Sequence, residues 1–274
     1  MFEQILENVQ KKVPLVHSIT NYVTVNDCAN IILASGGSPI MADDINEVGD
    51  ITSLCSSLVI NMGTLNEMVI RAMIAAGKKA NELGHPVVLD PVGVGASRLR
   101  NETVHTLLQE VKFSVIRGNS SEIKFLATGV GNTQGVDASE EDKVTADTLD
   151  GVVSFAKKLS ASTGAIIAIT GETDIVADQD TAYIITNGHP MMSRVTGTGC
   201  MLSSVIGSYL GANPHRPLLA TAAAVCGMGL CGELAFQRLT EMDGGTNTYR
   251  MLLIDFMSKL QTVMLKEGAK FAVR

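Results

Sequence analysis

Short apolar runs alternate with segments of helical periodicity along most of the chain. Four of these runs are apolar on both faces, as strands covered by helices on both sides must be. They span residues 57–61, 86–90, 114–117 and 165–170. Between the first two runs, residues 64–84 keep apolar side chains at helical spacing, with Thr64 and Glu67 as a capping box and Gly84 as the stop. This alternation predicts an α/β fold with a mainly parallel sheet between two layers of helices.

The pattern changes after residue 170. Two short strand patterns joined by polar turns predict an antiparallel extension at one edge of the sheet, and they are followed by helical patterns. The strand patterns lie at 174–178 and 181–186, and the helical patterns near 199–212, 216–240 and 247–267. An amphipathic helix is also expected at the N-terminus, where Phe2, Ile5, Leu6 and Val9 share one face. No linker interrupts the chain, so we expect one domain over residues 1–274, with Gly129–Asp142 as a surface loop.

Composition excludes several classes of protein. The chain of 274 residues is 46% apolar and 18% charged, which excludes disorder. A net charge of −7, 4% aromatic residues and no Trp argue against a nucleic-acid partner. The five cysteines are scattered, as reduced thiols are, and the helix at the N-terminus is acidic where a signal peptide would be basic. The uncharged stretch Val195–Pro214 is broken by glycines, so we expect a buried helix rather than a membrane span, and a cytoplasmic protein.

Polar residues end four of the predicted strands. These residues are Asn61, Asp90, Arg117 with Asn119, and Thr170. One polar ending means little, because solubility alone favours it. Ligands of open parallel sheets bind beyond the carboxyl ends of the strands, so four such endings together predict a site at that edge.

A glycine-rich turn precedes the first of the late helices. In Val195–Cys200 two glycines separated by one residue open the helix, so that backbone N–H groups can point at an anion. Taken alone this is weak evidence, since glycines often only make a tight turn. Cys200 falls in the first helical turn, where the helix dipole is expected to lower the pKa of its thiol. The alternative, a small thiol packed behind the loop, is equally compatible with the position.

Two carboxylates could hold a hard cation such as Mg²⁺. Asp90 ends a strand, and Glu122 lies just beyond the next one. Each has a simpler interpretation: Asp90 as a turn residue, and Glu122 as a charge at a helix N-terminus capped by Ser120. Their convergence at one sheet edge favours the metal. His17 could line a pocket, but a structural histidine with satisfied hydrogen bonds is the favoured interpretation.

With these residues in view, the chain resembles the hydroxyethylthiazole kinases of the ribokinase-like superfamily over nearly its whole length. Six segments carry the resemblance, and it is their order and spacing together that make it specific. They are Pro14–Asn21, Ala34–Met41, Leu89–Ala96, Ile116–Glu122, Ala168–Glu172 and Val195–Cys200. The resemblance implies a ribokinase-like three-layer sandwich. It also implies transfer of the ATP γ-phosphate to the primary hydroxyl of 4-methyl-5-(2-hydroxyethyl)thiazole in thiamine biosynthesis or salvage.

The resemblance also implies roles for individual residues. Arg117 and Thr170 would contact the phosphates of ATP, and Asp90 and Glu122 would serve Mg²⁺. On the alcohol side, the implied residues are Met41, Gly197 and Cys200. Where the wider superfamily has an aspartate as general base, this chain has Cys200, as thiazole kinases often do, so the identity of the base stays open.

The resemblance further implies a homotrimer with its sites at subunit interfaces. The small residues of Ala220–Gly232 fit close helix packing, within or between subunits. No nucleic acid or membrane is expected as a partner.

Three other functions remain open on the sequence. One is a kinase of the same fold for another small alcohol, such as hydroxymethylpyrimidine or pyridoxal, although the stretch from His17 to Met41 favours the thiazole. Another is a nucleotide-dependent lyase that repairs hydrated nicotinamide cofactors. A third is a non-catalytic sensor of thiazole or nucleotide, for which Asp90, Arg117 and Glu122 would have no use. Release of ADP with a panel of alcohols separates these functions.

Overall fold

The computed structural model describes residues 1–129 and 147–274. In this part of the chain nine strands form one sheet in the order β2-β1-β3-β4-β5-β6-β7-β8-β9. The strands are β1 (Leu15–Ile19), β2 (Ser38–Ile40), β3 (Ser57–Asn61), β4 (Val87–Asp90), β5 (Val115–Asn119), β6 (Ile166–Thr170), β7 (Asp174–Ala177), β8 (Ala182–Ile185) and β9 (Phe271–Val273). From β2 to β6 neighbouring strands are parallel, and from β6 to β9 they are antiparallel. The predicted mainly parallel sheet with an antiparallel extension is therefore confirmed.

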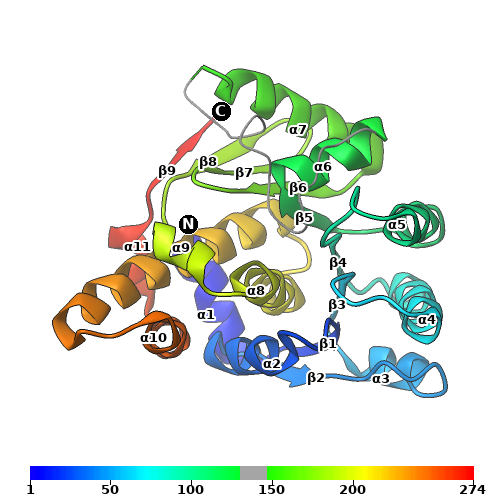
Figure 1. The fold of residues 1–274 in the computed structure, drawn as a ribbon, viewed down its shortest axis with the longest axis horizontal. Helices are drawn as coiled ribbons and strands as arrows, with labels where there is room; N and C mark the ends of the chain where they lie inside the picture. The colour runs from blue at the N-terminus through cyan, green and yellow to red at the C-terminus, as the bar shows by residue number, and fades with distance from the viewer. Residues whose placement is uncertain (130–146) are drawn as a thin grey trace.

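Two layers of helices cover the sheet (Figure 1). One layer holds α3 (Val48–Leu54), α4 (Glu67–Leu83), α5 (Arg98–Glu110), α6 (Ser120–Thr128) and α7 (Leu149–Thr163). The other holds α1 (Phe2–Lys12), α2 (Val25–Ala34), α8 (Thr198–Ala212), α9 (Pro217–Met242), α10 (Thr246–Ser258) and α11 (Thr262–Gly268). Each layer buries its own apolar cluster against one face of the sheet. This is the three-layer α/β sandwich expected from the sequence.

Two predicted helix boundaries were wrong, one for a local reason and one for a tertiary reason. Helix α4 begins after Asn66, whose side chain accepts from the backbone N–H of Val69, so Thr64 does not cap it. The single helix expected over 247–267 is two helices, α10 and α11. The chain leaves the helix between them and buries Leu260, whose side chain packs against Gly227 of α9. Tertiary burial of one leucine outweighs continued helical periodicity here.

The order of the first strands could not be read from the sequence. Strands β1 and β2 were not predicted as a pair, and β1 lies between β2 and β3. The chain thus adds β2 on one side of β1 and then crosses to the other side for β3. In open α/β sheets the crevice at such a reversal is where ligands bind. The structure therefore directs attention to the carboxyl ends of β1 and β3.

The two late helices next to the sheet are deeply buried. The uncharged stretch interpreted as a buried helix is α8, with eleven of its fifteen residues buried. Within the described residues, α9 is the one helix long and apolar enough to cross a membrane, and 83% of its most apolar window is buried inside the protein. The small residues of Ala220–Gly232 pack within the chain, because a Cβ on Gly229 would meet Asn187 at 2.7 Å and one on Gly232 would meet Met192 at 2.6 Å. Packing between subunits is therefore not their role. Of the predicted surface loop Gly129–Asp142, all but Gly129 lies outside the described residues.

Candidate functional site

Polar side chains gather at the carboxyl edge of the sheet, as predicted. In the β3–β4 pair Asn61 lies opposite Asp90, and in the β5–β6 pair Asn119 lies opposite Thr170. Arg117 precedes Asn119 on β5 and reaches back toward both pairs. The four predicted strand ends therefore form one continuous rim.

Asp90 is the fully buried centre of this rim. Its Oδ2 accepts hydrogen bonds from Asn61 Nδ2 and Ser203 Oγ, each at 2.8 Å. Its Oδ1 has no hydrogen bond and lies 3.6 Å from Nη1 of Arg117. Burial raises the pKa of the Asp90 carboxyl, and the positive charge of Arg117 opposes that rise. Asp90 thus keeps one oxygen unused beside a cation.

Arg117 links three of the site elements. Its Nη2 donates to Thr170 Oγ1 at 2.6 Å. A Cβ on Gly199 would lie 2.6 Å from Nη1, so the guanidinium packs against the first turn of α8. An anion at that helix N-terminus would meet the guanidinium, the dipole of α8 and the hydroxyl of Thr170 together. Arg117, Thr170 and the glycine turn therefore lie together at one point of the sheet edge.

Glu122 is held rigidly by backbone donors. Its Oε1 accepts from the N–H of Gly93 and its Oε2 from the N–H of Asn119, each at 2.8 Å. The second contact belongs to a capping box in which Asn119 is the N-cap, so the expected cap, Ser120, is wrong. Burial raises the pKa of the Glu122 carboxyl to about 7, and the negative charge of Asp90 adds to the rise.

The residues at this edge fit a Mg²⁺ ion that shares its ligands with phosphate. Asp90 offers a buried oxygen without a partner, and the negative charge of Asp90 opposes the ionisation of Glu122. A hard cation would relieve both effects. Two carboxylates do not complete a coordination sphere, and the described residues contain no cluster of three or more acidic, histidine or cysteine ligands. Phosphate oxygens and water would have to supply the rest.

Cys200 is joined to Asp90 by a chain of side-chain amides. The Nδ2 of Asn21 donates to Cys200 Sγ at 3.3 Å and to Asn61 Oδ1 at 3.0 Å. Asn61 in turn donates to Asp90. Burial raises the pKa of the Cys200 thiol to about 11, and the charge of Asp90 reinforces the rise. The expected lowering of this pKa is therefore wrong: desolvation outweighs the dipole of α8.

Gly197 is required for backbone reasons. It is the N-cap of α8 with φ 88°, and a Cβ there would lie 2.4 Å from Cγ2 of Thr24. The glycine turn therefore packs closely against Thr24, which is the N-cap of α2. Met41 directly follows β2, and β1 separates β2 from β3 in the sheet. Its neighbour Ala42 accepts a hydrogen bond from the buried ring of His17 at 2.8 Å, so His17 is structural, as favoured from the sequence.

Two residues of the site were missed from the sequence. Asn21 follows β1, and its part in the site became visible only with the strand order. Ser203 lies one helical turn after Gly199, on the face of α8 that meets Asp90. The i, i+4 spacing from the glycine turn was the available signal for it.

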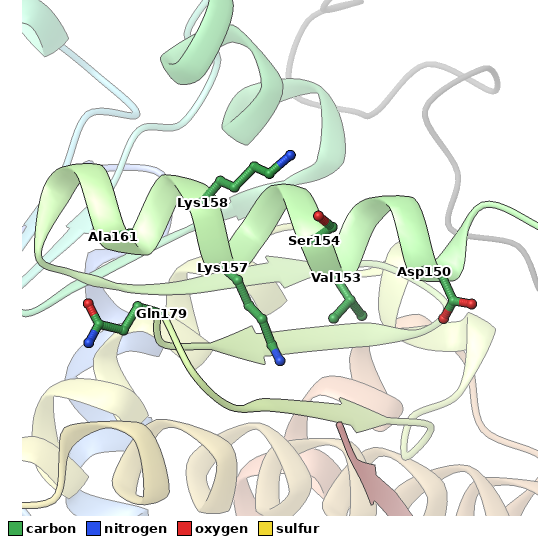
Figure 2. A pocket seen from close by; sticks show the side chains of 7 residues that line it. All are labelled: Asp150, Val153, Ser154, Lys157, Lys158, Ala161 and Gln179. Atoms are coloured by element: carbon green, nitrogen blue, oxygen red, sulfur yellow. The ribbon is translucent and has the colours of Figure 1, made fainter.

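A separate shallow groove of about 340 Å³ runs along α7 (Figure 2). It is lined by Asp150, Val153, Ser154, Lys157, Lys158, Ala161 and Gln179. Lys157 and Lys158 point in opposite directions from the helix, and Lys157 Nζ donates to the backbone oxygen of Asp180. The two ammonium groups therefore do not face a common ligand, and the rim is the better candidate for a functional site.

Comparisons of the sequence and of the structure with known proteins find relatives of one family. A sequence profile of the Hydroxyethylthiazole kinase family matches residues 6–263. Hydroxyethylthiazole kinase of Clostridium acetobutylicum is 59% identical over 271 residues, covering 99% of both chains, and that of Desulfovibrio desulfuricans is 49% identical, covering 98% and 97%. The solved structure of a hydroxyethylthiazole kinase protein from Pyrococcus horikoshii OT3 superposes with a TM-score of 0.88 at 30% identity, covering 100% of this chain and 98% of that one.

Proposed function

The chain belongs to the hydroxyethylthiazole kinase family, and on that premise we propose that it phosphorylates the primary hydroxyl of 4-methyl-5-(2-hydroxyethyl)thiazole with ATP, in thiamine biosynthesis or salvage. The observation that carries the proposal is the contact of Arg117 with Asp90, Thr170 and Gly199. It gathers a cation, a carboxylate, a hydroxyl and a helix N-terminus at one point of the sheet edge. Such a set suits phosphoryl transfer, which needs mainly positioning and neutralised charge.

On the nucleotide side, Arg117 and Thr170 bind the phosphates of ATP. Asp90 and Glu122 are the residues that would hold Mg²⁺. When bound, the ion neutralises charge on phosphate oxygens. The guanidinium can meet two phosphate oxygens at once, and the first backbone N–H groups of α8 aim at the transferred group.

On the alcohol side, Met41 and Gly197 contact the substrate, and Cys200 lies between the alcohol and the amide of Asn21. With a pKa of about 11 the thiol is protonated at neutral pH. It therefore cannot take the proton of the alcohol. Its sulfur can orient the hydroxyl through a hydrogen bond, and the proton passes to a phosphate oxygen of the product or to water as the new O–P bond forms. A loose transition state tolerates this, because the attacking hydroxyl keeps most of its proton until late.

The proposed assembly is a homotrimer in the cytoplasm, with no nucleic acid or membrane partner. Apolar side chains exposed in the single chain support an assembly: Tyr22 and Val23 are 79% and 59% exposed, and they lie between Asn21 and Thr24 of the site. We propose in addition that residues 1–274 form one domain, because a single sheet carries both apolar clusters.

A coupled assay of ADP release tests the function. Hydroxyethylthiazole is offered beside hydroxymethylpyrimidine and pyridoxal, with and without Mg²⁺. We expect Mg²⁺-dependent ADP release with the thiazole, at a kcat/KM well above that of the other alcohols. Release with another alcohol alone would identify a different kinase. Turnover of a hydrated nicotinamide cofactor, or binding without any turnover, would contradict the proposal.

A further inference from the structure

Arg100 lies behind the rim and is not explained by the roles above. It stands in the first turn of α5, and its side chain turns back toward the sheet. Its Nη1 donates to the backbone oxygens of Met62 and Val92, each at 2.5 Å, and its Nη2 to that of Gly63 at 2.7 Å. One guanidinium thus binds three carbonyl groups from two separate loops.

The two loops carry the two halves of the site. Met62 and Gly63 follow Asn61 at the end of β3, and Val92 follows Asp90 at the end of β4. Both loops are also joined at their base, where the N–H of Met62 donates to the carbonyl of Asp90 at 3.0 Å. Arg100 joins the same two loops a second time, through its hydrogen bonds to Met62, Gly63 and Val92.

Each loop also donates a backbone hydrogen bond to a side chain of the site. The N–H of Gly63 donates to Asn61 Oδ1 at 2.9 Å, the same oxygen that binds Asn21 and, through it, Cys200. The N–H of Gly93 donates to Glu122. The guanidinium also packs over Gly93, where a Cβ would lie 3.4 Å from it. Arg100 thus contacts both the loop that binds Asn61, on the alcohol side, and the loop that binds Glu122, on the phosphate side.

The chemistry of the side chain suits this task. Within the described part of the chain no carboxylate forms an ion pair with Arg100, so its donors serve backbone carbonyls alone. A planar guanidinium presents its N–H groups in a fixed fork, and it reaches acceptors on two loops without changing conformation. A lysine ammonium is a point charge on a flexible stem and cannot hold the same three oxygens in one plane.

We propose that Arg100 is a positioning residue for phosphoryl transfer, which fixes the Asn61–Gly63 loop against the Asp90–Gly93 loop and so sets the distance between the alcohol and the phosphate. The proposal rests on the proposed function for its kinetic consequence. Misplacing reacting groups by about 1 Å can cost about 100-fold in rate. Loss of Arg100 therefore lowers kcat while the contacts that bind each substrate remain.

The kinetic test compares Arg100→Lys and Arg100→Ala with Arg98→Lys and Arg98→Ala. Arg98 is the matched control, since it lies two residues earlier with a 90% exposed side chain paired to Glu102. We expect kcat of the Arg100 variants to fall about 10- to 100-fold with each KM changed less than about threefold. Methylguanidinium should restore part of the kcat of Arg100→Ala. The Arg98 variants should match the wild type.

A merely structural arginine gives a different result. Arg100→Lys would then lose melting temperature but keep the wild-type kcat per folded molecule, and methylguanidinium would raise the melting temperature alone. Either result overturns the proposal. If Arg100→Ala does not fold, Arg100→Lys decides, because it keeps the charge and the length.

A second measurement is independent of the substrate. Hydrogen exchange of the ligand-free protein reports the N–H groups of Gly63 and Gly93, whose acceptors depend on the loops. We expect both to exchange at least about tenfold faster in Arg100→Lys than in Arg98→Lys. Unchanged exchange overturns the role of Arg100. If the wild type does not phosphorylate the thiazole but exchange accelerates, the proposed function fails and the role of Arg100 stands.

Discussion

The side-chain amide of Asn21 donates to the side-chain oxygen of Asn61 across 3.0 Å, and the two residues lie at the carboxyl ends of β1 and β3, the strands on either side of the strand-order reversal. The Oδ1 of Asn21 accepts from both the N–H and the hydroxyl of Thr24, so its orientation is fixed and both amide hydrogens point into the site. One goes to Asn61 and the other to Cys200. The contact thereby joins the thiol to the carboxylate of Asp90.

Replacing either carboxylate of the rim should abolish most activity without unfolding the protein. For Asp90→Asn and Glu122→Gln we expect kcat at least about 100-fold lower, because each change removes an oxygen charge that would hold Mg²⁺. Excess Mg²⁺ should restore part of it. The melting temperature of Asp90→Asn should not fall, since the variant removes a buried charge and keeps an acceptor for Asn61 and Ser203. Near-normal rates at low Mg²⁺ in both variants would exclude the metal role.

Arg117→Ala should raise the KM for ATP more than the KM for the alcohol. The guanidinium reaches Thr170 and the first turn of α8, where the phosphates are proposed to bind. Steady-state kinetics with each substrate varied in turn measures both constants. Arg71→Ala is a control, because Arg71 is an exposed helix residue paired with Glu67. Equal changes in both KM values would contradict the assignment.

Gly197→Val should be more harmful than Cys200→Ala. A thiol that is protonated at neutral pH can orient the alcohol but cannot take its proton, so Cys200→Ala should lower kcat by no more than about 100- to 1,000-fold, the modest end of general-base catalysis, with KM values nearly unchanged. A side chain at Gly197 collides with Thr24 and distorts the first turn of α8 itself. Values of kcat for the two variants, with circular dichroism to verify folding, test this order. The reverse order would make Cys200 a principal catalytic group.

The raised pKa of the Cys200 thiol can be tested by measuring how fast the thiol is alkylated at different pH values. Because the thiol stays protonated below about pH 11, alkylation by iodoacetamide should be slow at neutral pH and should accelerate up to that range. The loss of kinase activity on alkylation, followed against pH, reports this residue, with Cys200→Ala as the insensitive control. Fast modification at neutral pH would indicate a stabilised thiolate.

Asp174 should make the protein less stable as pH rises. Burial raises the pKa of this carboxyl to about 7, against 3.8 for the ordinary group, although the N–H of Gly171 opposes the rise. Between about pH 4 and pH 7 the folded state therefore binds more protons than the unfolded state, so the free energy of unfolding falls with pH. Asp174→Asn should flatten the curve and melt higher than the wild type at about pH 8. Asp180→Asn, at an exposed position, should follow the wild type.

The proposed trimer can be tested at Tyr22 and Val23, the exposed residues beside the site. The wild type should sediment as a trimer, and Tyr22→Glu should shift it to smaller species with a loss of activity, because a charge then replaces an apolar side chain that is 79% exposed in the single chain. Leu99→Glu on α5, at a residue 50% exposed, is the matched control. An active monomer in the wild type would refute the trimer.

The strands from β3 to β8 and the helices α1, α4, α8 and α9 could be predicted because their patterns are local. The run Ser57–Asn61 is apolar on both faces, and it is a strand in the structure with all residues buried. The pKa of Cys200 could not be predicted, because it depends on how deeply α8 is buried. Asn21 could not be found either, because its partner Asn61 is close only once β1 and β3 are neighbours.

The contacts at Asp90 also constrain how the protein can be made. Ser203 reaches Asp90 across 113 positions, and Asn21 reaches Cys200 across 179. During synthesis, the strands from β1 to β6 leave the ribosome well before α8 does, and until then Asp90 has neither the serine nor the glycine turn beside it. A chain cut between β8 and α8 would leave the rim on one fragment and the glycine turn, Cys200 and Ser203 on the other. Activity would then report their reassociation, which makes this junction suitable for a split-enzyme sensor.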